Sequence, residues 1–241
     1  MLTDFHSNGS YESIAKIFEL LDIEDYAYMV RTTDLENDNY TDNVKYVTKK
    51  CYEYLKKSKV YGGELIINKI GSPGRSFLMP NLNRPVSLGM NQFMIRTNTN
   101  HVLEAFLWVY FNSTIGKKII YRKVNGTVPL TIDKESVRSL PVPDFTIDFQ
   151  RKIASYVNRA NEIKLRSKEK YEEAERLLLA ELGFDESELE VDNESMSVRS
   201  YKKIINSGRI DAEYYLPKYD KLLEILSVSY THLTLPTNSL V

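Results

Sequence analysis

The sequence predicts an α+β protein: a domain with a twisted, mainly antiparallel sheet and flanking helices, followed by one long coiled-coil-type helix. Two observations support this prediction. Short apolar runs alternate with Gly and Pro turns between residues 63 and 97, and a helical period extends from residue 147 to 183. Because the predicted strands and helices do not alternate regularly, an α+β arrangement is favoured over a doubly wound parallel sheet.

The predicted strands are short apolar runs bounded by turn residues. They are "YAYMVRTTDL" (26–35), "GELIINKI" (63–70), "RSFLM" (75–79) and "NQFMIRT" (91–97). The first has a polar exit, and the last three are joined by a Gly-Ser-Pro-Gly turn and by a loop over residues 80–85. This turn lacks the Lys-Ser/Thr pair and the following helix of a phosphate-binding loop, so we interpret it as a connection between strands.

Three segments have the spacing of helices. Residues 10–21 predict an amphipathic helix, and residues 101–121 predict a helix that buries Trp108 and Phe111. The segment from 147 to the Gly at 183 would be about 50 Å long, so it must pack against another long helix. The predicted partner face repeats in steps of four and three and consists of Phe149, Ile153, Tyr156, Ala160 and Ile163.

These elements divide the chain into five segments. Residues 1–146 form the mixed domain, and residues 147–183 form the long spacer helix. An acidic linker covers 184–200, and residues 201–228 look like the start of an incomplete second repeat. Residues 229–241 have neither charge nor helical period, so we expect a non-native tail and a truncated chain.

Composition argues against several classes of function. The 42% apolar and 27% charged content predicts a folded globular protein. The single Cys51 cannot form an internal disulfide, and the three scattered histidines lack zinc-ligand spacing, so we expect neither metal nor cofactor. With no long apolar run and no signal-peptide pattern, we expect a cytoplasmic protein without membrane contact. Asp34, Glu36 and Asp38 are clustered but lack a partner His, so catalysis is not expected.

The net charge of −1 hides a segregation of charge along the chain. Residues 1–44 carry two basic and ten acidic side chains, whereas residues 45–147 carry sixteen basic and six acidic ones. Lysines interleaved with tyrosines are typical of surfaces that bind phosphates, although a solvated helix face is the alternative interpretation. The expected phosphate contacts are Lys45, Lys49, Lys50, Lys56, Lys57, Lys59, Lys117, Lys118, Arg122 and Lys123.

The loops between the predicted strands have a composition that suits contacts with nucleic-acid bases. Loops rich in Gly, Asn, Ser and Arg can approach a groove closely and present amide and guanidinium groups to base edges. The candidates for base contacts are Arg75, Asn81, Asn83, Arg84, Asn91 and Gln92. The alternative is that the Asn residues form turns and that Asn91 and Gln92 bind the backbone at a strand start.

Several segments together carry a family resemblance. They include "TDFHSNGSYESI", "YAYMVRTTDLE", "ELIINKIGSPGR", "SLGMNQFMIR", "NGTVPLTIDKESVRSLPVPDF", "FQRKIASYV" and "GRIDAEYYLPKYDKL". In this order, over about Thr3 to Leu226, the sequence resembles the DNA-specificity (S) subunit of type I restriction-modification systems. The resemblance implies that residues 1–146 are a target recognition domain and that the long helix is a spacer that docks the methyltransferase subunit.

The resemblance also implies a non-catalytic protein that binds double-stranded DNA and meets the restriction subunit only indirectly. A full subunit has two recognition domains, whereas this chain has one and the lead-in to another, so it would read one half of a bipartite site. Two copies that associate through the long helix would restore a two-headed reader. A coiled-coil scaffold that does not read DNA is the alternative, but it has no need for the basic segment.

Overall fold

The computed structural model describes residues 1–97, 100–182, 197–217, 219–220 and 222–223. The chain divides into two compact units, Met1–Ala160 and Asn161–Val241. The first unit contains both strands and helices, whereas the described residues of the second are helical or irregular. The predicted α+β class is therefore confirmed.

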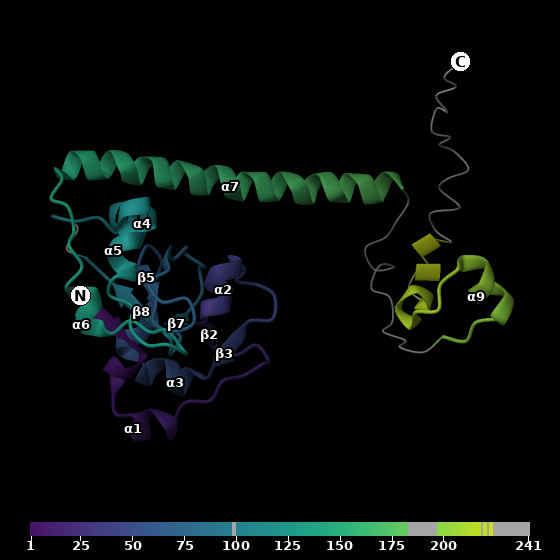
Figure 1. Cartoon of the computed structure of the whole chain (residues 1–241), viewed down its shortest axis with the longest axis horizontal. Helices are drawn as coiled ribbons and strands as arrows, with labels where there is room; N and C mark the ends of the chain where they lie inside the picture. Colours follow the sequence, from purple (N-terminus) through teal and green to yellow (C-terminus); the bar gives the residue numbers. More distant parts are fainter. Residues whose placement is uncertain (98–99, 183–196, 218, 221, 224–241) are drawn as a thin grey trace, which may run out of the picture. The chain divides into compact units, whose positions relative to one another are not determined.

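The first unit has two four-stranded sheets rather than the single sheet that was predicted (Figure 1). Sheet A has the order β1–β8–β5–β6 and is antiparallel throughout. Sheet B has the order β3–β2–β7–β4, and its central pair β2–β7 is parallel. The strands are β1 Leu2–Asp4, β2 Ala27–Val30, β3 Lys45–Val47, β4 Lys59–Val60, β5 Leu65–Asn68, β6 Ser76–Leu78, β7 Val86–Leu88 and β8 Gln92–Ile95.

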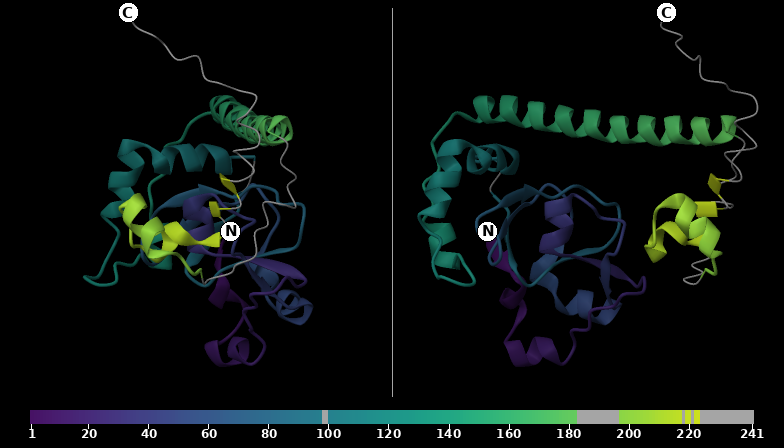
Figure 2. Two further views of the ribbon diagram at one scale, coloured as in Figure 1. Left: turned by 90° about the vertical axis from the view of Figure 1, so that its right-hand side faces the viewer. Right: turned by 45° about the vertical axis from the view of Figure 1, so that its right-hand side comes forward.

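The described residues also form helices. The α-helices are α1 Tyr11–Ala15, α2 Thr32–Asn37, α3 Lys49–Tyr54, α4 Glu104–Asn112, α5 Thr114–Tyr121, α6 Lys134–Arg138, α7 Ile147–Glu181 and α9 Tyr201–Ser207. Short 3-10 helices cover η1 Phe5–Asn8, η2 Lys56–Ser58 and η3 Ala212–Tyr215. Figures 1 and 2 show α4 lying beside the first turns of α7.

Alternation of side chains along β5 places sheet A between two cores. Successive side chains of a strand point to opposite faces. Leu65 and Ile67 therefore pack with α4 and α5, whereas Ile66 packs against β2, β4 and β7 of sheet B. Both faces of β5 are buried, which explains why its sequence is an unbroken apolar run instead of an alternating one.

The same alternation in β2 accounts for the other half of the unit. Tyr28 and Val30 join the core between the two sheets, whereas Ala27 and Met29 pack with α3, α1 and η1. The order of layers is therefore α4 and α5, sheet A, sheet B, and α3. Figure 1 shows the strands lying between α5 and α3.

Three predicted elements have different bounds in the structure. The strand expected over 26–35 ends at Val30, because the Asp34 carboxylate accepts a hydrogen bond from the Arg31 N–H (2.8 Å) and starts α2. The helix expected over 10–21 ends at Ala15, after which the chain turns and packs Phe18 into the core. Four strands of two or three residues, β1, β3, β4 and β7, were not predicted.

The helix expected over 101–121 is two helices that break at Ser113. The Ser113 Oγ accepts a hydrogen bond from the Gly116 N–H (3.1 Å), which caps the start of α5. A Cβ on Gly116 would lie 2.0 Å from the Tyr110 carbonyl oxygen, so the break requires glycine there. Phe111 is buried as predicted, whereas Trp108 is only half-buried and donates a hydrogen bond to the Ser76 carbonyl (3.2 Å).

The long helix is confirmed as α7, Ile147–Glu181. Its first turns belong to the compact unit Met1–Ala160, because Gln150 hydrogen-bonds to the Leu103 N–H and Ile153 packs against the core beside α4 and α5. Most of the predicted linker, residues 184–196, lies outside the described residues, as does the predicted tail 229–241; within 201–228, α9 and η3 are described.

Candidate nucleic-acid interface

Folding pairs three of the ten acidic residues of the N-terminal segment with cations of the basic segment that follows it. The ion pairs join Asp4 to Lys69 and Lys134, Asp22 to Lys45, and Glu36 to Arg75. Charge that is segregated along the sequence is thus partly neutralised in three dimensions. The surface of residues 45–147 is therefore not uniformly basic, and only those cations that remain exposed and unpaired can attract a polyanion.

One set of exposed cations lies on the α3 layer. Helix α3 buries Cys51 and Tyr52, so its opposite face is in solvent. A turn follows in which Asn8 Oδ1 accepts a hydrogen bond from the Lys57 N–H (2.7 Å), which fixes η2. The exposed members of this set are Lys49, Lys50, Lys56 and Lys57.

Two predicted members of this set are already partnered within the protein. Lys45 forms an ion pair with Asp22, and Lys59 forms one with Glu53 (3.1 Å) while its Nζ lies 4.2 Å from the centre of the Tyr52 ring. Both lysine side chains are mostly buried. They are therefore weaker candidates for phosphate contacts than their exposed neighbours.

The second set lies on α5, on the other outer layer. Gly116 and Ile120 face the core and Ile119 packs partly against it, whereas the other positions of the helix are exposed. Lys117, Lys118 and Arg122 are exposed, and Lys123 is half-buried. Because sheets A and B separate α5 from α3, one flat surface does not present both sets.

The end of β5 brings the α5 layer together with two predicted base contacts. The Asn68 N–H donates to the Arg75 carbonyl (2.9 Å), and the Lys69 N–H donates to the Asn91 carbonyl (2.8 Å). Arg75 and Asn91 therefore flank the same strand end. Gly74 lies against α5, since a Cβ there would come within 2.1 Å of the Ile120 side chain. We call this region the β5 end: residues 68–75, Asn91 and the α5 cations.

The 125–131 segment completes the β5 end. Ile70 pairs with Thr131, which in turn pairs with Asn125, and the Ile132 N–H donates to the Lys69 carbonyl (3.0 Å). These contacts bring the chain that directly follows Lys123 to the edge of the hairpin turn. The structure therefore groups Arg75 and Asn91 with the α5 cations, although they are 26 to 48 residues apart in sequence.

A polar network built on Glu36 supports Arg75. One carboxylate oxygen, Glu36 Oε1, accepts hydrogen bonds from Asn68 Nδ2 (3.2 Å) and Ser72 Oγ, and pairs with Arg75 Nη1 at 3.4 Å. The Arg75 guanidinium also lies 5.6 Å from the centre of the Phe77 ring. Sequence reasoning noted Glu36 only as one of a group of acidic residues, because its partners are at least 32 residues away.

The interpretation of Gln92 as a base contact is wrong for this structure. Its side chain is fully buried, and its Oε1 accepts a hydrogen bond from the Gly89 N–H (3.1 Å). No atom of this side chain is therefore presented to a base edge. The alternative interpretation, that Gln92 binds backbone at the start of a strand, agrees with this hydrogen bond.

The other candidate base contacts lie in the loop between β6 and β7. Asn83 has a positive φ of 52°, and its N–H donates to Asn81 Oδ1 (2.9 Å), which is turn-forming behaviour. Arg84 is half-buried, stacks 4.6 Å from the centre of the Tyr28 ring and donates to the Tyr40 carbonyl. This loop is thus held by contacts within it and with Tyr28 and Tyr40, and the exposed residues in it are Pro80, Asn81 and Asn83.

The predicted partner face of the long helix is divided. Phe149 packs against the Phe145 ring, with 4.9 Å between centroids, and Ile153 packs into the core beside α4 and α5. Ile153 thus contacts its own unit rather than a partner helix. Phe149 is still 43% exposed, and the other exposed members are Tyr156, Ala160 and Ile163.

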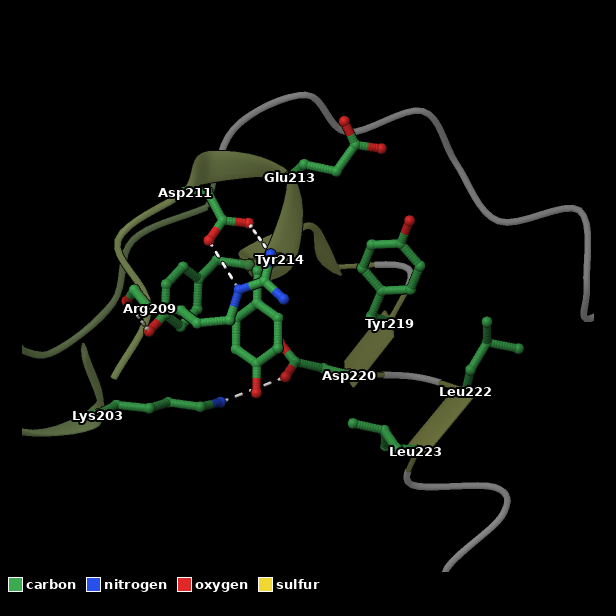
Figure 3. A pocket seen from close by; sticks show the side chains of 10 residues that line it. Lys203, Arg209, Asp211, Glu213, Tyr214, Tyr219, Asp220, Leu222 and Leu223 are labelled. Carbon is green, nitrogen blue, oxygen red and sulfur yellow. Dashed lines mark hydrogen bonds and ion pairs between the residues drawn. The ribbon is translucent and has the colours of Figure 1, made fainter. Parts of the chain in front are cut away.

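The second unit contains a pocket of about 500 Å³ (Figure 3). Arg209 pairs with Asp211 (2.7 Å) and lies 4.8 Å from the centre of the Tyr214 ring, while Lys203 pairs with Asp220 (3.2 Å). These cations neutralise carboxylates of the same pocket. They therefore leave little net charge with which to attract a charged ligand.

Neither a metal centre nor a membrane-spanning helix is present among the described residues. Across the described ranges, no three His, Cys, Asp or Glu side chains are arranged to hold a metal ion. None of the described helices is both long and apolar enough to cross a membrane. No protein-family model matches the sequence, and no curated protein matches it either.

Proposed function

We propose that this chain is the DNA-specificity subunit of a type I restriction-modification complex. In this role it reads one half of a bipartite double-stranded DNA site and docks the methyltransferase subunit through its long helix. The observation that carries the proposal is the β5 end, where Arg75, Asn91 and the α5 cations come together. Such a surface combines side chains that can read bases with cations that can hold phosphates.

The long helix supports the same proposal. A 35-residue helix of about 50 Å begins directly after the mixed domain, at the position where the resemblance places a spacer. Its first turns are fixed to the domain, so the recognition surface and the helix would move as one body near that junction. The proposed subunit is not an enzyme, acts in the cytoplasm where the DNA is, and leaves methylation and cleavage to its partner subunits.

A second candidate function is an interaction scaffold that does not read DNA. The observation that favours it is the exposure of large apolar side chains along α7. They are Phe149, Tyr156, Ile163, Leu165, Tyr171, Leu177 and Leu178. Both candidates use these side chains to bind a protein, so only DNA binding distinguishes them.

A binding experiment tests the proposal. The purified chain, alone and with the methyltransferase subunit, is mixed with a random-sequence duplex pool, and the bound fraction is separated by gel shift and sequenced. We expect binding that is enriched for one short sequence and strengthened by the methyltransferase subunit. Absence of any duplex binding, with the methyltransferase still bound, would leave the scaffold as the better account.

A further inference from the structure

Two contacts within the protein orient the exposed side chain of Arg75. Its side chain is 57% exposed, yet it has two supports: Glu36 pairs with Nη1 at 3.4 Å, and the Phe77 ring lies 5.6 Å below the guanidinium. An exposed Arg normally loses much rotamer freedom when it binds, because its side chain is long. Arg75 is partly ordered before any ligand arrives.

Glu36 is itself held in place. Its Oε1 accepts hydrogen bonds from Asn68 Nδ2 and Ser72 Oγ, and Asn68 is fully buried at the end of β5. The Asn68 Nδ2 also donates to Ser72 Oγ (3.0 Å), so the three side chains form a closed triangle. The carboxylate that orients Arg75 is therefore anchored to the sheet and not to a loose loop.

On these contacts we infer that Glu36 is a positioning residue, and that it presents Arg75 to a guanine in the major groove. Glu36 occupies one edge of the guanidinium, at Nη1, which leaves further N–H donors for a ligand. Two parallel N–H donors match the O6 and N7 acceptors of guanine, and this is the commonest specific contact between Arg and a base. The inference rests on the proposed function, because it requires a DNA duplex at the β5 end.

The surroundings favour a base over an isolated phosphate as the partner of Arg75. A carboxylate beside the guanidinium repels a phosphate, whereas a guanine edge is neutral and accepts hydrogen bonds. Lys117, Lys118 and Arg122 are better partners for phosphates, because no acidic side chain within the described chain pairs with them. These cations would hold the backbone while Arg75 reads a base.

Sequence selection with four variants tests the inference. Each is selected against the random duplex pool: Arg75→Ala, Glu36→Ala, the double variant, and Glu36→Gln, which keeps an oxygen that can accept the two hydrogen bonds from Asn68 and Ser72 and contact Arg75. We expect Arg75→Ala to reduce the preference for guanine at one position by about tenfold or more. Glu36→Ala should reduce it in part, the double variant should match Arg75→Ala, and Glu36→Gln should restore much of the preference.

A matched control and the contrary outcomes separate the hypotheses. Glu53→Ala breaks a comparable ion pair with Lys59 on the α3 layer and should leave the base preference unchanged. Full guanine preference in Glu36→Ala, or no positional change in Arg75→Ala, would overturn the inference while leaving the proposed function intact. A wild-type chain that binds without sequence preference would overturn the proposed function itself. Thermal unfolding of each variant shows whether a weaker preference reflects misfolding.

Discussion

At the scale of single residues, the start of α7 depends on one buried amide. Gln150 is 1% exposed, and its Oε1 accepts a hydrogen bond from the Leu103 N–H (3.0 Å). Its Nε2 donates to the carbonyls of His101 (3.0 Å) and Phe145 (2.9 Å). All three partners are backbone groups outside the helix, so this side chain ties the first turn of α7 to residues 101–103 and to Phe145.

We expect Gln150→Ala to destabilise the first unit. It removes three hydrogen bonds and leaves their backbone partners poorly satisfied, which should lower the free energy of unfolding by about 1–3 kcal/mol. Urea denaturation followed by circular dichroism measures the change. Asn158→Ala on the same helix is exposed and serves as the control. Equal stability of the two variants would mean that the junction does not depend on Gln150.

Asp4 links the two oppositely charged segments of the chain. Burial of this side chain raises its pKa, but the hydrogen bond from Ser7 and the nearby charges of Lys69 and Lys134 outweigh that effect. The net result is a pKa below the ordinary value of 3.8. Because the folded state favours the ionised form, Asp4 stabilises the protein above the unfolded pKa, and this stabilisation is lost as the pH falls through the folded pKa.

The pH dependence of stability checks this assignment. Asp4→Asn should be less stable than wild type at pH 7, and the difference should shrink as the pH falls below about 4. Thermal melts between pH 2 and 7 would record both effects, with the exposed Asp144→Asn as the control. A difference from wild type that stays constant over the whole range would argue that the ionised form of Asp4 is not what matters.

At the scale of elements, the two predicted phosphate-binding sets lie on different layers. The α3 set lies on the layer that packs on sheet B, whereas the α5 set lies on the layer that packs on sheet A, beside the β5 end. A duplex that is read by Arg75 would therefore meet the α5 set first. From the sequence, all these cations were expected to contact phosphates. Because the structure places the two sets on different layers, phosphate binding by each set can be tested separately.

Salt dependence distinguishes the two sets. Replacement of Lys117, Lys118, Arg122 and Lys123 by Ala should flatten the dependence of log K on log salt by about 0.9 for each phosphate that is no longer neutralised. The equivalent change of Lys49, Lys50, Lys56 and Lys57 is the matched control and should alter the slope less. Fluorescence anisotropy with one duplex at several salt concentrations gives both slopes. A larger effect from the α3 set would place the duplex on the opposite layer.

At the scale of the whole molecule, the part of α7 after residue 160 exposes several large apolar side chains to solvent. Ile163 is 59% exposed, and Leu178 is exposed to the same extent. Leaving apolar area in water costs about 25 cal/mol per Å², so a partner surface would be stabilising. We propose a second copy as the occupant, with the two helices antiparallel, because such a contact is isologous and restores a two-headed reader.

Sedimentation velocity at tens of micromolar tests this proposal. The wild-type chain should be a dimer, and Ile163→Asp together with Leu178→Asp should convert it to a monomer, because a charge in an apolar seam costs desolvation. Asn161→Asp adds the same charge on the opposite face and should leave the dimer intact. Ile153 is unsuitable for this test because it packs into its own domain. A wild-type monomer would refute the dimer.

Local patterns in the sequence were sufficient for the fold class, the main strands and the long helix. The buried runs of β5 and β2 and the 35 residues of α7 are encoded by neighbouring residues, so their periodicity can be read directly. The short strands β4 and β7 could not be found in this way. They consist of two or three residues, and they form because partners from distant segments supply their hydrogen bonds.

The grouping of site residues was decided by tertiary structure alone. Arg75 and Asn91 could be named from their chemistry, but their meeting with α5, the support from Glu36 and the burial of Gln92 depend on contacts between distant segments. The charge segregation shows the same limit. The numbers of acidic and basic residues in each segment could be counted from the sequence. Coulomb interactions, however, depend on distance in space, and folding brings Asp4 to Lys69 and Glu36 to Arg75.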